Sequence, residues 1–171
     1  ANLFHVMRRQ MIWSFRKPLS VFTPKSLLRH QKAVSSVKEL TSGTFQEVIH
    51  LKAKTASKVK RVLFCTGKIY YELLDRKEAD KREDVVIVRI EQLYPYPESE
   101  VDEIMSSYKN ADFVWVQEEP KNMGAWTFLL RYDINLKLKL ISRKASASPS
   151  TGFKKIHFKE QAEIIDKAFE I

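Results

Sequence analysis

The sequence contains little cysteine, little glycine and no long apolar run, and each shortage excludes a class of protein. The single cysteine, Cys65, excludes an intramolecular disulfide and fits a reducing compartment. No apolar run approaches the roughly 20 residues that a membrane-spanning helix needs. Of the four glycines, Gly67 precedes a lysine as in a Walker A loop, but Val62 stands where such a loop needs its first glycine. We therefore expect neither a disulfide scaffold nor a membrane partner nor a Walker-type nucleotide site.

Residues that could catalyse a reaction or bind a metal are also sparse. The four histidines have no metal-ligand spacing with one another or with Cys65. Cys65 itself lies in an apolar run and is expected to be buried rather than nucleophilic. Glu118 and Glu119 are neighbours at a predicted strand end, so they point apart and make a poor general acid–base pair. His5, in an apolar, arginine-rich helix, has the usual pattern of a packing histidine. We expect no metal site and no complete catalytic group.

Acidic residues are outnumbered, with Asp+Glu 21 against Lys+Arg 30, a net charge of +9 and a pI near 9.6. Such a balance favours anionic partners, among them phosphates, nucleic acid, acidic protein surfaces and anionic lipid. A basic surface that simply maintains solubility explains the same numbers. The basic residues are scattered and no helix-turn-helix or RNA-binding motif is present, so we expect no nucleic-acid partner.

The segment Arg61–Leu93 has the length and pattern of one βαβ unit. Two continuous apolar runs, Val62–Cys65 and Val85–Val88, flank a helical pattern that follows Gly67. Continuous rather than alternating runs are typical of strands that are covered on both faces, as in a parallel sheet. The 44% hydrophobic content supports a core of this kind. The sequence predicts a doubly wound α/β fold with a mostly parallel sheet of about five strands.

The rest of the chain is interpreted as additions to this unit. The predicted strands are Leu19–Phe22, Phe45–Leu51, Phe113–Val116 and Leu136–Ile141. The predicted helical segments are Leu3–Phe15, Lys25–Val34, a helix with Pro97 as its first residue, Asn122–Tyr132, and a closing helix that contains Phe158 and Phe169. The segment Ser35–Phe45 is expected to be a connection. The start, without methionine or a signal-peptide pattern, is expected to be the interior of a longer chain. Residues 1–17 are expected to end a preceding domain and residues 18–171 to form the next one.

Polar side chains follow four of the predicted strands. In open parallel sheets, ligands bind outside the carboxyl ends of the strands. The segment Thr66–Lys68 also opens a helix, whose free N–H groups and dipole favour an anion. The pattern indicates a site for a phosphorylated ligand, although a common turn with solvated lysines explains each signal taken alone. The strand-end residues are Thr23, Lys68, Gln117, Arg143 and Lys144.

Several motifs together resemble one known family over essentially the whole chain. The motifs are Phe4–Gln10, Phe22–Arg29, Gly67–Tyr71, Arg89–Leu93, Gln117–Pro120 with Asn122, Gly124 and Trp126, Ile141–Arg143, and Ser148–Gly152. They resemble the carboxy-terminal region of 2-oxoglutarate dehydrogenase, the thiamine-diphosphate-dependent first component of its complex. The resemblance extends to the multifunctional form, in which the dehydrogenase carries its own acyltransferase domain.

This resemblance implies an enzyme of the tricarboxylic acid cycle that decarboxylates 2-oxoglutarate and transfers succinyl to a lipoyl carrier. The chain would be its transketolase-like third domain, preceded by the end of the pyrimidine-binding domain. The family's Gly-Asp-Gly motif for thiamine diphosphate and Mg²⁺ is absent here, so we expect neither to bind to this chain and no activity in isolation. Of the family's active-site groups only His5 is present, matching a histidine near the substrate. The implied partners are a second subunit in a homodimer and the dihydrolipoyl succinyltransferase component.

Some members of the family bind acetyl-CoA as an allosteric activator on this domain. The residues that match that site are Thr23, Lys38, Lys68, Gln117, Arg143 and Lys144. Lys38 and Lys144 stand where arginine is usual, which weakens bidentate phosphate recognition. The strand-end pattern indicates much of the same set without the resemblance, so a site for acetyl-CoA or a nucleotide is predicted.

Two other functions compete with a structural and regulatory domain of a thiamine enzyme. A stand-alone module for CoA or a nucleotide would bind its ligand tightly without any preceding domain. A nucleic-acid binder would show steeply salt-dependent binding to any duplex. The resemblance places the protein in the bacterial cytoplasm, or in the mitochondrial matrix if its source is eukaryotic.

Overall fold

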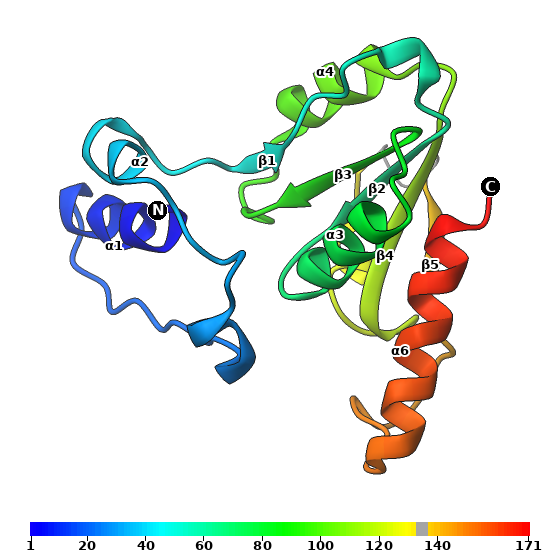
Figure 1. The fold of residues 1–171 in the computed structure, drawn as a ribbon. Coiled ribbons are helices and arrows are strands. Elements are labelled where there is room, and N and C mark those ends of the chain that lie inside the picture. The colour runs from blue at the N-terminus through cyan, green and yellow to red at the C-terminus, as the bar shows by residue number, and fades with distance from the viewer. Residues whose placement is uncertain (133–136) are drawn as a thin grey trace. The chain divides into compact units, whose positions relative to one another are not determined.

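Five strands form one sheet in the computed structural model, which describes residues 1–132 and 137–171 (Figure 1). The strands are β1 (Val48–His50), β2 (Arg61–Cys65), β3 (Val85–Ile90), β4 (Asp112–Pro120) and β5 (Lys139–Arg143). Their order across the sheet is β1-β3-β2-β4-β5. Only β1 runs antiparallel to its neighbour, and the other pairs are parallel. The prediction of a mostly parallel sheet of about five strands is confirmed.

Helices cover both faces of this sheet, as the doubly wound prediction requires. One face packs against α3 (Ile69–Ala79) and α6 (Lys154–Phe169), and the other packs against α4 (Glu98–Ser107) and α5 (Trp126–Leu129). Figure 1 shows α3 and α6 on the side of the sheet nearer the viewer. All residues of β2 are buried because its side chains alternate between two apolar cores. None of the helices in the described residues has the length and apolarity that a membrane crossing needs.

The described residues divide into two compact units, residues 1–47 and residues 48–171, and the sheet belongs to the second. The first unit contains α1 (Asn2–Ile12), the 3₁₀ helix η1 (Lys25–Arg29) and α2 (Val37–Ser42). Residues 18–47 therefore group with residues 1–17 in one unit. The assignment of residues 1–17 to a preceding domain stays a prediction. A second 3₁₀ helix, η2 (Ala56–Lys58), precedes β2.

Two predictions for residues 1–47 are wrong. Leu19–Phe22 is not a strand, because no other strand in the described residues pairs with it, and its Phe22 side chain is 96% exposed. The supposed connection Ser35–Phe45 contains α2, which begins with a reciprocal capping box. The Ser36 hydroxyl accepts from the Glu39 N–H, and the Glu39 carboxylate accepts from the Ser36 N–H. A serine followed three residues later by glutamate is a known signal for a helix start, and it was available in the sequence.

Three predicted elements of the second unit are present with changed bounds. The helix expected over Asn122–Tyr132 is reduced to Trp126–Leu129, because Lys121–Gly124 form a turn after β4. Pro97 precedes α4 as its N-cap instead of being its first residue. The last strand begins at Lys139, later than predicted, and Leu136 of that prediction lies outside the described residues.

An ion pair in the loop before β3 makes the stability of the fold depend on pH. The Arg82 guanidinium donates to both Asp84 carboxylate oxygens at 2.7 and 3.0 Å and holds the pKa of Asp84 below its ordinary value. A depressed folded-state pKa adds stability above the unfolded pKa of about 3.9, and that stability is lost as the pH falls through the folded pKa. We expect Asp84→Asn to lower the urea midpoint at about pH 7 and to differ less from the wild type near pH 3. A difference of equal size at both pH values would contradict the assignment.

Candidate functional site

The chain reverses its winding direction next to β2, and this creates a place for a ligand. From β2 it passes through α3 on one face to β3, and it then returns through α4 on the other face to β4. Because β3 and β4 lie on opposite sides of β2, the carboxyl ends of β2 and β4 border a topological switch point. Gly67 makes the turn there, with a φ of 75° that glycine adopts without strain, and α3 begins directly after it.

Lys68 and Glu118 meet at this switch point. Lys68 follows β2, Glu118 lies near the end of β4, and the Lys68 ammonium donates to the Glu118 carboxylate. Glu72, one turn further along α3, lies 3.8 Å from the same ammonium. Gln161 of α6 donates to Glu72 at 2.9 Å and to Glu118 at 3.2 Å. The positive charge predicted to bind an anion is thus already matched by two carboxylates of the chain.

Arg143, at the end of β5, joins the same network. Its Nε donates to the Glu118 carbonyl at 2.9 Å, and a terminal nitrogen lies 3.5 Å from the Glu160 carboxylate. The other terminal nitrogen donates to the Pro149 carbonyl. The guanidinium therefore ties β4, α6 and the loop before α6 together. Lys68 and Arg143 are both beside Glu118, so the structure brings two of the predicted residues to one place.

Gln117 has a structural role in the described chain. Its amide oxygen accepts from the Trp115 indole N–H and from the Trp126 backbone N–H, each at 3.0 Å. Its amide nitrogen donates to three backbone carbonyls, of which Met123 is nearest at 2.8 Å. An amide has two donor hydrogens and two acceptor lone pairs, so this side chain is fully occupied. Gln117 shapes the turn behind the switch point from a buried position.

The three other predicted ligand residues, Lys144, Thr23 and Lys38, are all exposed. Lys144 is exposed just after β5. Thr23 and Lys38 belong to residues 1–47, and both are exposed there. Thr23 follows no strand, so the strand-end argument does not apply to it. Their roles stay predictions that rest on the resemblance.

His5 is buried within residues 1–47. Its Nε2 lies 2.7 Å from the Glu39 carbonyl, and because a carbonyl only accepts, Nε2 carries the proton. Its Nδ1 is buried without a hydrogen-bond partner. A Cβ at Gly43 would stand 3.0 Å from Nε2 and 2.3 Å from the Glu39 carbonyl oxygen, so a glycine is needed for this approach. His5 is therefore held in one tautomer by the Glu39 carbonyl.

The carboxylates and the amide that neutralise the site are not among the site residues predicted from the sequence. Glu72 could have been found, since its i,i+4 spacing from Lys68 is the usual helical ion-pair spacing. Glu118 follows a predicted strand, but no local pattern pairs it with Lys68, which lies 50 positions earlier. Glu160 and Gln161 had no local signal, because they reach the site from α6.

Cys65 is buried as predicted, and burial raises the pKa of its thiol to about 12. It is therefore a packing residue and not a nucleophile at neutral pH. Across residues 1–132 and 137–171, no three histidine, cysteine, aspartate or glutamate side chains gather closely enough to hold a metal ion.

Comparison with known proteins gives one consistent result. Residues 34–169 match the family described as 2-oxoglutarate dehydrogenase C-terminal. The 2-oxoglutarate dehydrogenase E1 component of Haemophilus influenzae is 45% identical over 98% of this chain, and that of Azotobacter vinelandii is 42% identical over 100% of it. The multifunctional 2-oxoglutarate metabolism enzyme of a Mycobacterium species is 46% identical over 99% of it. The chain spans only 19%, 19% and 14% of these three proteins.

Proposed function

Because the chain belongs to the 2-oxoglutarate dehydrogenase C-terminal family, we propose that it is the structural and regulatory carboxy-terminal domain of such an enzyme. The observation that carries this proposal is the family match over residues 34–169, which includes the whole sheet and all of α6. The enzyme would decarboxylate 2-oxoglutarate and transfer succinyl to the lipoyl group of a dihydrolipoyl succinyltransferase partner. This domain would contribute packing, subunit contacts and regulation to that activity.

Thiamine diphosphate and Mg²⁺ would supply the carbanion-stabilising chemistry of that enzyme. The residues of this chain do not fit either group. The sequence lacks a Gly-Asp-Gly motif, and the described residues hold no cluster of metal-ligating side chains. We therefore assign no chemical step to residues 48–171.

His5 is proposed as the one active-site residue of the chain. Its support is the fixed tautomer: Nε2 donates to the Glu39 carbonyl, which leaves the Nδ1 lone pair as the free acceptor. Such a nitrogen can accept a hydrogen bond or a proton from a substrate that reaches it. In the enzyme, His5 would help to bind the substrate or to transfer protons.

The switch-point network is proposed as part of a site for acetyl-CoA or a nucleotide. Lys68 and Arg143 would bind phosphate groups there, with Lys144, Thr23 and Lys38 as further contacts and Gln117 as the buried support. The support is the position of Lys68 at the start of α3, beside the carboxyl ends of β2 and β4. Because the carboxylates of Glu118 and Glu72 already contact the Lys68 ammonium, an anionic ligand must displace them.

Calorimetric titration with acetyl-CoA, repeated with AMP, tests this site. We expect saturable binding to the chain and a loss of at least about tenfold in affinity in Lys68→Ala, because a phosphate contact to a cation is removed. Lys109→Ala is the matched control, since this exposed lysine precedes β4 at the other end of the strand. Equal binding by wild type and Lys68→Ala would exclude the site. Binding to this chain alone would indicate that the regulatory site is contained within it.

Glu118→Gln is expected to tighten the same binding by about fivefold to tenfold. The substitution keeps the size of the side chain and its hydrogen bonding to Gln161, but it removes the carboxylate that competes with the ligand for Lys68. The same titration measures the effect, and Glu119→Gln is the control on the neighbouring exposed position. Unchanged or weaker binding in Glu118→Gln would show that this carboxylate does not compete with the ligand.

A homodimer and a location in the bacterial cytoplasm, or in the mitochondrial matrix of a eukaryote, complete the proposal. The apolar surface of residues 1–47 supports the proposal that this unit packs against another protein surface. Exposed apolar side chains of this unit include Met11, Ile12, Trp13, Phe15 and Phe22. Surfaces of this composition usually contact another protein surface.

A further inference from the structure

A cavity of about 620 Å³ lies at the opposite end of the sheet from the switch point. One wall is the connection between β1 and β2, residues 51–55 and 58. The other wall is the end of α3 and the turn into β3, residues 77, 78 and 81–83. Its volume falls within the range of small-molecule sites. We call it the lysine cavity, because lysine is the commonest residue in its lining.

The lysines of this cavity have no ion-pair partner in the described chain. They are Lys52, Lys54, Lys58, Lys77 and Lys81. No carboxylate of the described residues lies within ion-pair distance of any of them, and the one arginine of the lining, Arg82, is occupied by Asp84. Two glutamates, Glu78 and Glu83, are the acidic members of the lining. The cavity therefore carries a strong excess of positive charge.

The backbone carbonyls at the end of α3 do not need the lysine ammonium groups as hydrogen-bond donors. Cations near a helix end commonly interact with its last carbonyls. Here backbone N–H groups satisfy carbonyls of the last turn, because Asp80 donates to Arg76, Lys81 to Glu78 and Arg82 to Lys77. The ammonium groups therefore remain available to an external anion.

Hydrogen bonds hold the two walls in place. The Lys60 N–H donates to the Asp84 carbonyl at 2.8 Å and links the β1–β2 connection to the turn before β3. The Ala53 N–H donates to the Tyr108 hydroxyl at 3.2 Å and holds the first wall against the core. Arg82 also donates to the Phe169 carbonyl at 2.9 Å. These hydrogen bonds thus connect the two walls to each other and to the core.

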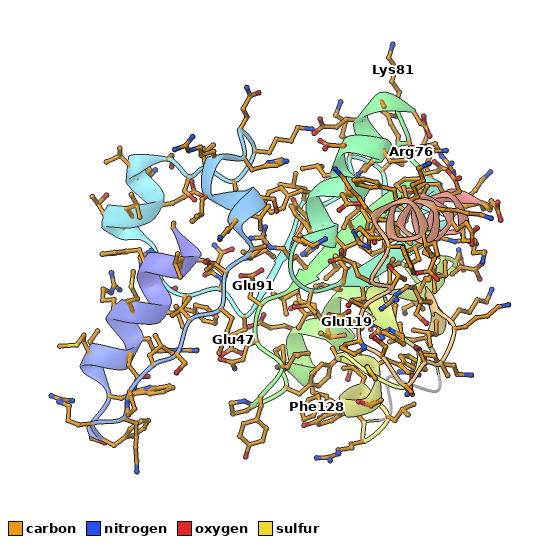
Figure 2. All side chains as sticks on the ribbon, turned by 90° about the horizontal axis from the view of Figure 1, so that it is seen from below. Glu47, Arg76, Lys81, Glu91, Glu119 and Phe128 are labelled. Carbon is orange, nitrogen blue, oxygen red and sulfur yellow. The ribbon has the colours of Figure 1, made fainter. Side chains whose placement is uncertain are left out.

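Lys77 is the member of the lining that distinguishes a site from a charged surface. It is half-buried, and burial lowers the pKa of its ammonium despite the nearby carboxylates of Asp84, Glu78 and Glu83. A desolvated ammonium gains more from a bound anion than a solvated one does. Figure 2 shows Lys81 at the far end of α3 pointing away from the sheet, which makes it a rim residue.

We propose that the lysine cavity binds a polyphosphorylated small molecule, one with two or more linked phosphate groups. Several flexible ammonium groups suit closely spaced phosphates, whereas the bidentate recognition of a single carboxylate favours arginine. Leu51, Ala53 and the lysine stems add apolar surface beside the charges. That surface would suit the organic part of a nucleoside di- or triphosphate.

Calorimetric titration of the whole chain with inorganic triphosphate, and separately with ATP, tests the proposal at low salt. In the Lys68→Ala background, which removes the proposed switch-point site, we expect one saturable site for each ligand. Adding Lys77→Met is expected to lower the affinity at least about tenfold, because its half-buried charge contacts the phosphates. Tighter binding of ATP would show that the organic part also contacts the cavity. Equal binding would show that the phosphates alone are recognised.

Lys109→Gln in the same background is the control, and it is expected to leave triphosphate binding unchanged. Loss of binding in Lys68→Ala would place the ligand at the switch point and overturn the proposal. So would an equal loss in Lys109→Gln, which would indicate attraction to overall charge only. If Lys77→Met unfolds, the exposed Lys52→Gln and Lys58→Gln together provide the same test. Absence of saturable binding to the wild type would also overturn it, independently of the result with acetyl-CoA.

Discussion

Replacing Arg61 with methionine is expected to lower the free energy of unfolding by about 3 kcal/mol. Arg61 begins β2 and is only 8% exposed. One terminal nitrogen donates to the carbonyls at the end of α6, those of Lys167, Ala168 and Glu170. The other lies 3.5 Å from the Asp112 carboxylate. Methionine fills a similar volume but leaves these desolvated acceptors without a donor, and it removes a cation from a helix end where the dipole favours one.

Urea unfolding followed by circular dichroism measures this effect. Arg76→Met is the matched control, because Arg76 also contacts α6 through Asp166 but is 38% exposed. An exposed ion pair contributes at most about 1 kcal/mol, so the control should change the midpoint little. Equal losses in the two variants would show that burial of Arg61 does not determine its contribution.

Gln117→Leu is expected to destabilise the fold by a similar amount, about 3 kcal/mol. Leucine has nearly the same volume, so the cost is that of polar groups left without partners. The Trp115 indole N–H and the Trp126 backbone N–H would both lose this buried acceptor, and the Met123 carbonyl would lose its donor. Urea unfolding measures the loss, and a loss below about 1 kcal/mol would contradict this account.

Gln117→Glu adds a pH test of the same environment. A glutamate could still accept from both tryptophan donors, but its second oxygen would face backbone carbonyls. Burial and those carbonyls favour the neutral acid, so its folded-state pKa would be raised above the unfolded value of about 4.3. Stability contributed by a raised pKa is complete below the unfolded pKa and is lost as the pH rises through the folded one. We therefore expect Gln117→Glu to be closest to the wild type near pH 4 and increasingly less stable toward pH 8.

The strands, and the sheet edge at which the candidate site lies, were predictable because residues close together in the sequence indicate both. Val62–Cys65 and Val85–Val88 are continuous apolar runs, and such runs identify strands that are covered on both faces. Once these strands are parallel, the residues after them must meet at one edge, which is how Lys68 and Arg143 were placed near each other. The segment Leu19–Phe22, predicted to be a strand, is the exception. A short apolar run becomes a strand only when another strand pairs with it, and sequence alone does not report the pairing.

Local pattern thus determined the fold class, the order of most elements, the burial of Cys65 and the resemblance that the family match confirms. The tertiary structure decided the partners of the charged and polar groups. Lys68 meets Glu118 across 50 positions of sequence, and Arg61 meets Ala168 across 107. The lysine cavity likewise joins residues before β2 to the end of α3. Apolar periodicity reports which face of an element is buried, whereas charge pairing depends on distances between elements, which only the packed sheet and its helices establish.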